Sequence, residues 1–240
     1  MPTTRRHFLR TAGVTASALP TAAAGQAGRS PNDRIQFATI GWGIMGSEDT
    51  RTAASVPGTK LVGVCDIYQG RLVRAQEIYG KDLFVTRDYR EILARQDVDA
   101  VFIATPDHWH ALQTVHACQA GKHVYCEKPA CRSVAEGRAM IEAARRYRRV
   151  VQIGSQGRSN AVARKACEFV RNGQLGKVTR VEIWHENNWT TDRIPPKTPP
   201  PPNLDWDMWL GPAKAREYHD LIHPFHFRWY MDFGGGFGRD

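Results

Sequence analysis

The chain has 240 residues, of which 42% are hydrophobic and 24% are charged. This composition fits a soluble globular protein with enough chain for one full domain and part of another. The net charge of +9 raises the question of a nucleic-acid partner, but the basic residues are spread along the chain. The densest cluster, Arg145–Arg149, stands at a predicted helix end without a base-reading motif, so we expect no nucleic-acid partner.

Residues 1–27 are predicted to be a targeting segment rather than part of the fold. Thr4–Arg10 contains two adjacent arginines followed by an apolar pair, which is the twin-arginine pattern, and a mildly apolar stretch follows. That stretch is too short and too weakly apolar to span a bilayer, so we expect no stable membrane anchor. The prediction is export through the twin-arginine pathway to the periplasm or the cell exterior, with a disordered basic N-terminus as the alternative.

The five cysteines form no C-x-x-C pair, and their number is odd. A protein that folds before export folds in a reducing compartment. We therefore expect no structural disulfides.

A glycine-rich motif follows the first predicted strand. The apolar run 35–40 indicates a buried strand, and it leads directly into a G-x-G-x-x-G motif made of Gly41, Trp42, Gly43, Ile44, Met45 and Gly46. Its glycines allow a tight turn, the approach of a pyrophosphate and close helix packing, and a helix predicted over 47–56 directs its free N–H groups at the phosphates. A glycine-rich turn of some other α/β protein is the alternative.

An acidic residue at the expected distance supports the prediction of a dinucleotide-binding motif. Asp66 ends the next predicted strand, 20 residues after Gly46, where a carboxylate can bind the hydroxyls of the adenosine ribose. The pattern therefore predicts a bound dinucleotide. NAD is favoured over NADP, because Asp66 would repel a 2′-phosphate.

Strands and helices continue to alternate up to about residue 155. Strands are predicted over 84–86, 99–105, 122–127 and 150–154, and helices over 69–79, 88–93, 106–120 and 133–146. This alternation predicts an α/β fold, with a Rossmann-type doubly wound parallel sheet over residues 33–155.

The pattern changes in residues 156–240. A helix is predicted over 159–172 and a long strand over 178–189, followed by a proline-rich tract. One helix and one good strand do not make a self-sufficient sheet domain, so we expect an incomplete α+β domain here.

In an open parallel sheet, ligands bind beyond the carboxyl ends of the strands. Lys128 is a cation at the tip of a mostly apolar strand, beside the expected place of a nicotinamide, and a lysine there can serve as general acid and base. Glu127 would hydrogen-bond the cofactor or orient this lysine. A solvated surface lysine remains an open alternative.

His108 and His110, with Asp107 and His116 nearby, suggest a metal site. Histidines two residues apart at a helix start point in different directions, and no further ligand set completes the site, so we expect no metal. The expectation is that one of the two histidines faces the nicotinamide and the other packs.

Several motifs together resemble the Gfo/Idh/MocA family, named after glucose–fructose oxidoreductase and inositol dehydrogenase, and particularly its exported members. They lie at residues 41–46, 64–66, 88–89, 104–110, 121–129, 204–212 and 234–236, and the Glu-Lys-Pro motif at 127–129 is the most specific of them. The resemblance implies a Rossmann domain, then a domain built on a large open antiparallel sheet. It also implies a nicotinamide cofactor, sugar or polyol substrates, and often a homo-oligomer.

The resemblance also assigns site residues. Lys128 corresponds to the catalytic lysine, and Asp240 to an Asp that the family places after the triple glycine. The family's His four residues later would fall beyond residue 240, so the resemblance implies that much of the second domain is absent. Besides the glycine motif and Asp66, the implied cofactor contacts are Thr105, Pro106, His110, Glu127, Lys128, Arg228 and Trp229.

We therefore predict an oxidoreductase that transfers hydride between tightly bound NAD, or NADP, and a hydroxyl or carbonyl of a small carbohydrate. One alternative is an NAD-dependent, redox-neutral glycoside hydrolase that works by oxidation and elimination. Another is a non-catalytic dinucleotide-binding fragment.

Overall fold

The computed structural model describes residues 34–184 and 195–234. The predicted targeting segment, residues 1–27, and Asp240 lie outside the described residues.

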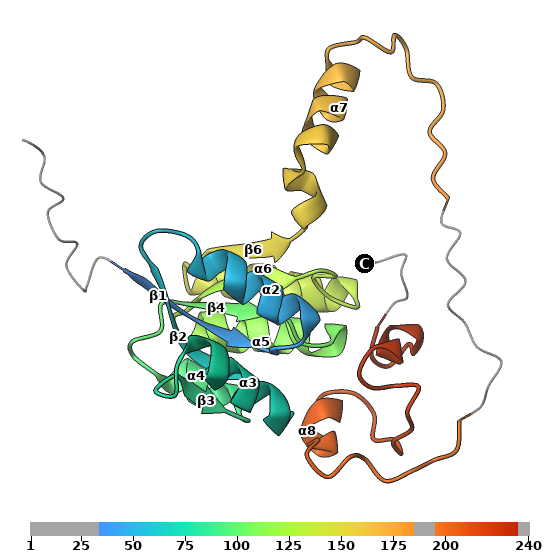
Figure 1. Ribbon diagram of the computed structural model, residues 1–240. Helices are drawn as coiled ribbons and strands as arrows, with labels where there is room; N and C mark the ends of the chain where they lie inside the picture. The colour runs from blue at the N-terminus through green and yellow to red at the C-terminus, as the bar shows by residue number, and fades with distance from the viewer. Residues whose placement is uncertain (1–33, 185–194, 235–240) are drawn as a thin grey trace, which may run out of the picture. The chain divides into compact units, whose positions relative to one another are not determined.

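Six parallel strands form one sheet, in the order β3-β2-β1-β4-β5-β6 (Figure 1). The strands are β1 (Ile35–Ile40), β2 (Thr59–Cys65), β3 (Phe84–Thr86), β4 (Ala100–Ile103), β5 (His123–Glu127) and β6 (Val151–Gly154). The register pairs Ile40 with both Cys65 and Ile103, so the carboxyl ends of three central strands lie at one level. The predicted doubly wound parallel sheet is confirmed.

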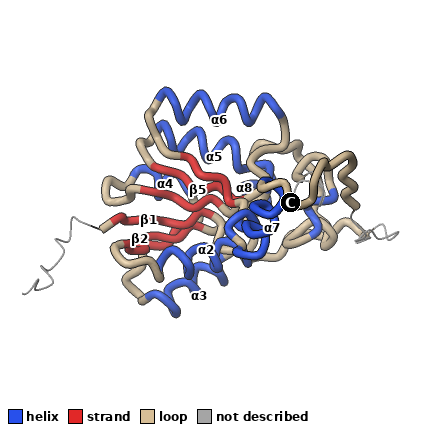
Figure 2. The backbone as a smooth tube through the Cα atoms, turned by 90° about the horizontal axis from the view of Figure 1, so that it is seen from above, coloured by secondary structure: helices blue, strands red, loops and turns tan. Residues whose placement is uncertain are grey.

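Helices cover both faces of this sheet, as Figure 2 shows. The helices α2 (Ile44–Ala54) and α3 (Gln69–Tyr79) lie on one face. The other face carries α4 (Tyr89–Ala94), α5 (Asp107–Gln119) and α6 (Val134–Arg146). This arrangement follows because the strand order runs outward from β1 in both directions, so right-handed crossovers place their helices on opposite faces.

Helix α2 begins at Ile44, three residues earlier than its apolar pattern suggested. The glycine motif is therefore shared between the turn and the helix, because Gly46 lies in the first turn of α2. A Cβ atom on Gly46 would collide with the carbonyl oxygen of Gly41. Only glycine lets the helix start this close to the strand end.

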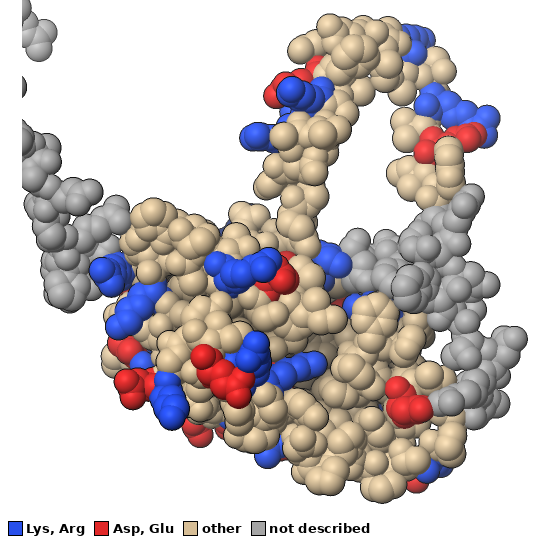
Figure 3. All heavy atoms as spheres, in the orientation of Figure 1, with Lys and Arg blue, Asp and Glu red and all other residues tan. Residues whose placement is uncertain are grey.

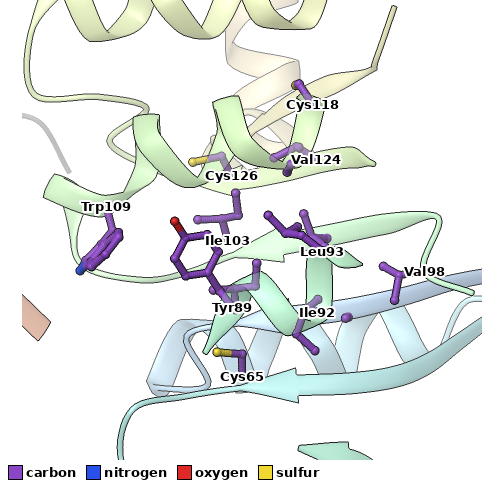
Figure 4. Packing of buried hydrophobic residues seen from close by; sticks show 14 of the residues in the cluster. Cys65, Tyr89, Ile92, Leu93, Val98, Ile103, Trp109, Cys118, Val124 and Cys126 are labelled. Atoms are coloured by element: carbon purple, nitrogen blue, oxygen red, sulfur yellow. The ribbon is translucent and has the colours of Figure 1, made fainter. Parts of the chain in front are cut away.

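The largest core lies between the sheet and helices α4 to α6 (Figure 4). Val101 and Ile103 of β4 and Ile92 of α4 are completely buried in it. At its edge, the rings of Tyr89 and Trp109 meet edge to face with centroids 5.7 Å apart. Close packing of this kind fixes the strand ends from which the site is built.

Residues 155–184 differ from the rest because every one of their side chains is exposed. They form a 3-10 turn, Gln156–Ser159, and the helix α7 (Ala161–Arg171), which Asn160 caps through hydrogen bonds to Oδ1. The predicted helix is therefore present. The strand predicted over 178–189 is wrong for residues 178–184, where no described strand pairs with the backbone, and 185–189 lie outside the described residues.

Residues 204–233 contain little regular structure, namely α8 (Trp206–Leu210) and a 3-10 turn at His226–Trp229. They bury a cluster of mostly aromatic side chains: Leu204, Trp209, Leu210, Tyr218, Ile222, Phe227 and Phe233. Asp205 caps α8 by accepting a hydrogen bond from the N–H of Met208 at 2.9 Å.

Within residues 34–184 and 195–234, no helix combines the length and the apolar character that a membrane crossing requires. On the face shown in Figure 3, basic and acidic side chains are interspersed.

Candidate active site

A cavity of about 760 Å³ lies beyond the carboxyl ends of β1, β2, β4 and β5. We call the loops that follow these strands the first wall, and residues 208–228 the second wall. The predicted cofactor-binding residues in its lining are Gly41, Gly43, Ile44, Met45, Asp66, Thr105, Pro106, Glu127, Lys128 and Arg228. The volume falls within the range of pockets that bind small molecules.

Other predicted residues lie behind the lining: Trp42, Gly46, His108, His110 and Trp229. Trp42 is buried and meets the ring of Tyr79 edge to face at 6.3 Å. Sequence reasoning missed several lining residues, among them Arg71, Arg87, Tyr89 and Gln113. For Arg71 a signal existed, because a cation on the first turn of the helix after Asp66 lies close to any ligand of that acid.

The glycine turn fits the pyrophosphate of a dinucleotide. The N-terminus of α2 at Gly43 has no side-chain cap, and Gly43, Ile44 and Met45 all lie on the cavity lining. Free N–H groups and the positive end of the helix dipole suit a phosphate at this position.

The carboxylate of Asp66 is buried and holds the first wall together. Its Oδ2 accepts hydrogen bonds from the N–H of Trp42 at 2.8 Å and from Nη1 of Arg71 at 3.1 Å. Its Oδ1 accepts a third from the N–H of Tyr68 at 2.9 Å. These bonds join the end of β2 to the glycine turn.

Lys128 directly follows β5, and its half-buried side chain lines the cavity. Glu127 before it is buried and accepts a hydrogen bond from the N–H of Lys128 at 3.3 Å. Burial, together with the carboxylates of Glu127 and Glu48, raises the pKa of Asp49 in α2 to about 7. Lys128 therefore lies on the cavity lining next to a buried carboxylate, whereas Asp49, whose pKa is raised, does not line the cavity.

His110 is buried behind the first wall with both ring nitrogens bonded. Its Nδ1 lies 2.7 Å from the carbonyl oxygen of Pro129, and its Nε2 lies 2.7 Å from that of Thr105. Since carbonyl oxygens only accept hydrogen bonds, both nitrogens donate and the ring is an imidazolium. Burial alone would lower the pKa, but the nearby Cys126 sulfur, the Pro129 carbonyl and the carboxylate of Asp107 outweigh it and raise the pKa to about 9.

The pKa of His108, two residues earlier, is shifted in the opposite direction. Burial lowers its pKa to about 4, against the opposing effect of the Trp209 carbonyl, which lies 2.8 Å from Nε2. The indole Nε1 of Trp109 donates to the same carbonyl at 3.0 Å. His108 therefore joins α5 to the second wall, and neither histidine lines the cavity, which differs from the expectation that one faces the nicotinamide.

All five cysteines lie among the described residues, and no disulfide joins them. Within the described ranges, no group of three or more His, Cys, Asp or Glu residues could hold a metal ion.

Comparison with known families agrees with this geometry. The model of the Gfo/Idh/MocA oxidoreductase family, NAD-binding Rossmann fold, matches residues 35–155. The model of the C-terminal alpha/beta domain of the same oxidoreductase family matches residues 161–240. The chain belongs to the Gfo/Idh/MocA family of NAD-binding oxidoreductases.

Individual relatives act in different ways. The inositol 2-dehydrogenase of Salmonella typhimurium (strain LT2) is 32% identical over 167 residues, which cover 69% of this chain and 49% of that protein. The glycosyl hydrolase family 109 protein 1 of Shewanella sp. (strain ANA-3) is 28% identical over 230 residues, covering 81% of this chain and 49% of that protein. The chain thus spans about half the length of these curated relatives.

A solved structure supports the fold. The WlbA dehydrogenase from Bordetella pertussis, in complex with NADH and UDP-GlcNAcA, is similar with a TM-score of 0.56 and 26% identity. The similarity covers 60% of this chain and 43% of that one.

Proposed function

We propose that this protein transfers hydride between a nicotinamide cofactor and a hydroxyl or carbonyl group of a sugar, a polyol or a derivative. The observation that carries the proposal is the position of Lys128, which shares one cavity with the glycine turn and the uncapped N-terminus of α2. An inositol 2-dehydrogenase among the relatives, and a dehydrogenase whose solved structure holds NADH and UDP-GlcNAcA, support this substrate class.

The first wall would supply the groups that this chemistry needs. The glycine turn and the first turn of α2 would hold the pyrophosphate, with Thr105, Pro106 and Glu127 further along the same cavity. A bound nicotinamide would supply the acceptor or donor of hydride. Nζ of Lys128 takes the proton from the substrate hydroxyl during oxidation and returns it to the carbonyl oxygen during reduction.

Binding and catalysis can be tested separately. Titration of the full chain with NAD⁺ and NADP⁺, followed by tryptophan fluorescence or calorimetry, should show binding of at least one of them. Lys128→Met should then lower turnover of a sugar or polyol by about 100-fold or more while cofactor affinity stays unchanged. Lys81→Met, at an exposed lysine, is the matched control. Absence of dinucleotide binding, or equal rates in both variants, would contradict the proposal.

A second candidate function is redox-neutral cleavage of a glycoside, which the family 109 relative favours. Transient oxidation at one sugar carbon acidifies the neighbouring C–H, permits elimination of the aglycone, and ends with addition of water and re-reduction. Product analysis separates the two candidates. Dehydrogenation yields a ketose or lactone and reduced cofactor, whereas cleavage yields free aglycone with no net change in the cofactor.

We also propose that residues 1–27 direct export of the folded protein with its cofactor bound. The adjacent Arg5 and Arg6 support this proposal. Replacing both with lysine should keep the protein in the cytoplasm, and unchanged export would contradict it.

A further inference from the structure

Two arginine side chains line the part of the cavity next to Asp66. Nη1 of Arg71 lies 3.1 Å from Oδ2 of Asp66. The same guanidinium lies 3.5 to 3.7 Å from the position that a Cβ atom on Gly43 would take, so it rests against the glycine turn. Arg87 is exposed and lines the same cavity, and its Nη2 donates to the carbonyl oxygen of Ile67, the residue after Asp66, at 3.0 Å.

The acid that would repel a 2′-phosphate is covered. The side chain of Asp66 is only 2% exposed, whereas that of Arg71 is 33% exposed. The carboxylate already accepts hydrogen bonds from two backbone N–H groups and from Arg71. A ligand that reaches this end of the cavity therefore meets guanidinium groups before it meets the carboxylate.

The charged side chains on the lining at this end of the cavity also favour an anionic ligand. Among the side chains that line this end of the cavity, one carboxylate faces two guanidinium groups. The carboxylates of Asp88 and Glu91 are near Cys65 but outside the lining, and Asp88 pairs with Arg90. Helix α3, which carries Arg71, begins without a side-chain cap, and the positive end of its dipole adds to the charge of the guanidinium groups. A guanidinium can hold two oxygens of a phosphate group at once, and such charge-assisted bonds are about twice as strong as neutral ones.

From these contacts we infer that Arg71, supported by Arg87, is a specificity-determining residue that holds the 2′-phosphate of NADP. The inference rests on the proposed function, since it requires a dinucleotide in this cavity. It reverses the preference for NAD that Asp66 alone suggests, because the carboxylate serves to fix the glycine turn and to orient Arg71. The protein should then bind NADP more tightly than NAD.

The test uses calorimetry on the full chain with NADP⁺ and NAD⁺, and with the fragments adenosine 2′,5′-bisphosphate and 5′-AMP. The native protein should bind the bisphosphate about tenfold or more tightly than 5′-AMP. Arg71→Ala should lower the affinity for NADP⁺ about tenfold and change that for NAD⁺ less than about threefold. Arg71→Lys should restore part of the loss, since it keeps the charge without the bidentate geometry.

Arg74→Ala is the matched control. It removes an arginine of the same helix whose partner is the exposed Glu77 at 2.8 Å, and it should leave both affinities unchanged. If Arg71→Ala does not fold, the preference of the native protein and the Arg71→Lys variant still decide the question.

Three outcomes would overturn the inference. Equal losses for both dinucleotides would mean that Arg71 acts on the pyrophosphate or only orients Asp66. A native protein that binds NAD⁺ but prefers 5′-AMP to the bisphosphate would remove the 2′-phosphate site while leaving the proposed function intact. Absence of binding of either dinucleotide would remove both.

Discussion

The two walls of the cavity are built in different ways. The first wall consists of short loops that follow the strands of a packed sheet, and the buried imidazolium of His110 joins two of them through Thr105 and Pro129. The second wall has little regular structure and rests on rings packed around Trp209. One helix serves both, because α5 carries His110 toward the first wall and His108 toward the second. Sheet topology therefore fixes the first wall, whereas the second depends on side-chain packing.

Removal of a ring should show how much the second wall depends on packing. Phe233 is completely buried, and its ring centroid lies 4.6 Å from that of Trp209. We expect Phe233→Ser to lower the free energy of unfolding by about 4 kcal/mol, because it leaves a cavity among aromatic side chains. Chemical denaturation measures this loss, and proteolysis within residues 204–233 would show whether the second wall comes loose first.

Phe169→Ser is the matched control, since it makes the same substitution on α7, where Phe169 is 46% exposed. Its cost should stay within about 0.5 kcal/mol. A cost above about 2 kcal/mol would mean that α7 packs against another surface.

The two histidines should make the walls respond oppositely to pH. The pKa of His110 is raised to about 9 from an ordinary value of 6.5. Its protonation therefore stabilises the fold fully below pH 6.5, and this contribution is lost as the pH rises through about 9. The loss amounts to roughly 3 to 4 kcal/mol at most, since one pKa unit corresponds to about 1.4 kcal/mol.

For His108 the dependence of stability on pH has the opposite direction. Its pKa is lowered to about 4, so the unfolded chain takes up a proton below pH 6.5 that the folded chain does not, and stability falls as the pH drops toward 4. Urea unfolding between pH 4 and 9 should show that His110→Gln removes the alkaline loss and His108→Gln the acid loss. Nitrogen NMR of the native protein should identify an imidazolium at His110 and a neutral ring at His108. A neutral His110 at pH 7 would contradict the first assignment.

The two walls also differ in how far the sequence reveals them. Apolar runs that end in glycine, acid or lysine predicted the strand ends, and therefore Gly41, Asp66 and Lys128, because both signals are local. The hydrogen bond of His108 to Trp209 joins residues 101 positions apart, and no periodicity in the sequence predicts it. Likewise, the charge of His110 depends on a carbonyl 19 residues away in another loop.

The incorrect strand over residues 178–184 has a related cause. Alternating apolar residues such as Val181 and Ile183 describe the two faces that a strand would have. A strand also needs a neighbour to accept its backbone hydrogen bonds, and alternation carries no information about that neighbour. The same limit applies to α7, whose pattern predicted a helix correctly while its burial depends on a partner surface.

A single glycine offers the most selective way to disturb the second wall. Gly211 ends α8 with a φ of 45°, and a Cβ atom there would collide with the indole of Trp109. That indole cannot move freely, because its Nε1 donates to the carbonyl of Trp209 at 3.0 Å. We expect Gly211→Ala to cost about 2 kcal/mol and to separate the second wall from α5. Gly157→Ala, where a Cβ meets nothing within 4 Å, should cost far less.

Dinucleotide affinity, measured on the same variants as stability, then shows how much each wall contributes to cofactor binding. If the first wall alone holds the pyrophosphate, Gly211→Ala weakens binding only slightly, and a complete loss of binding would show that both walls are needed.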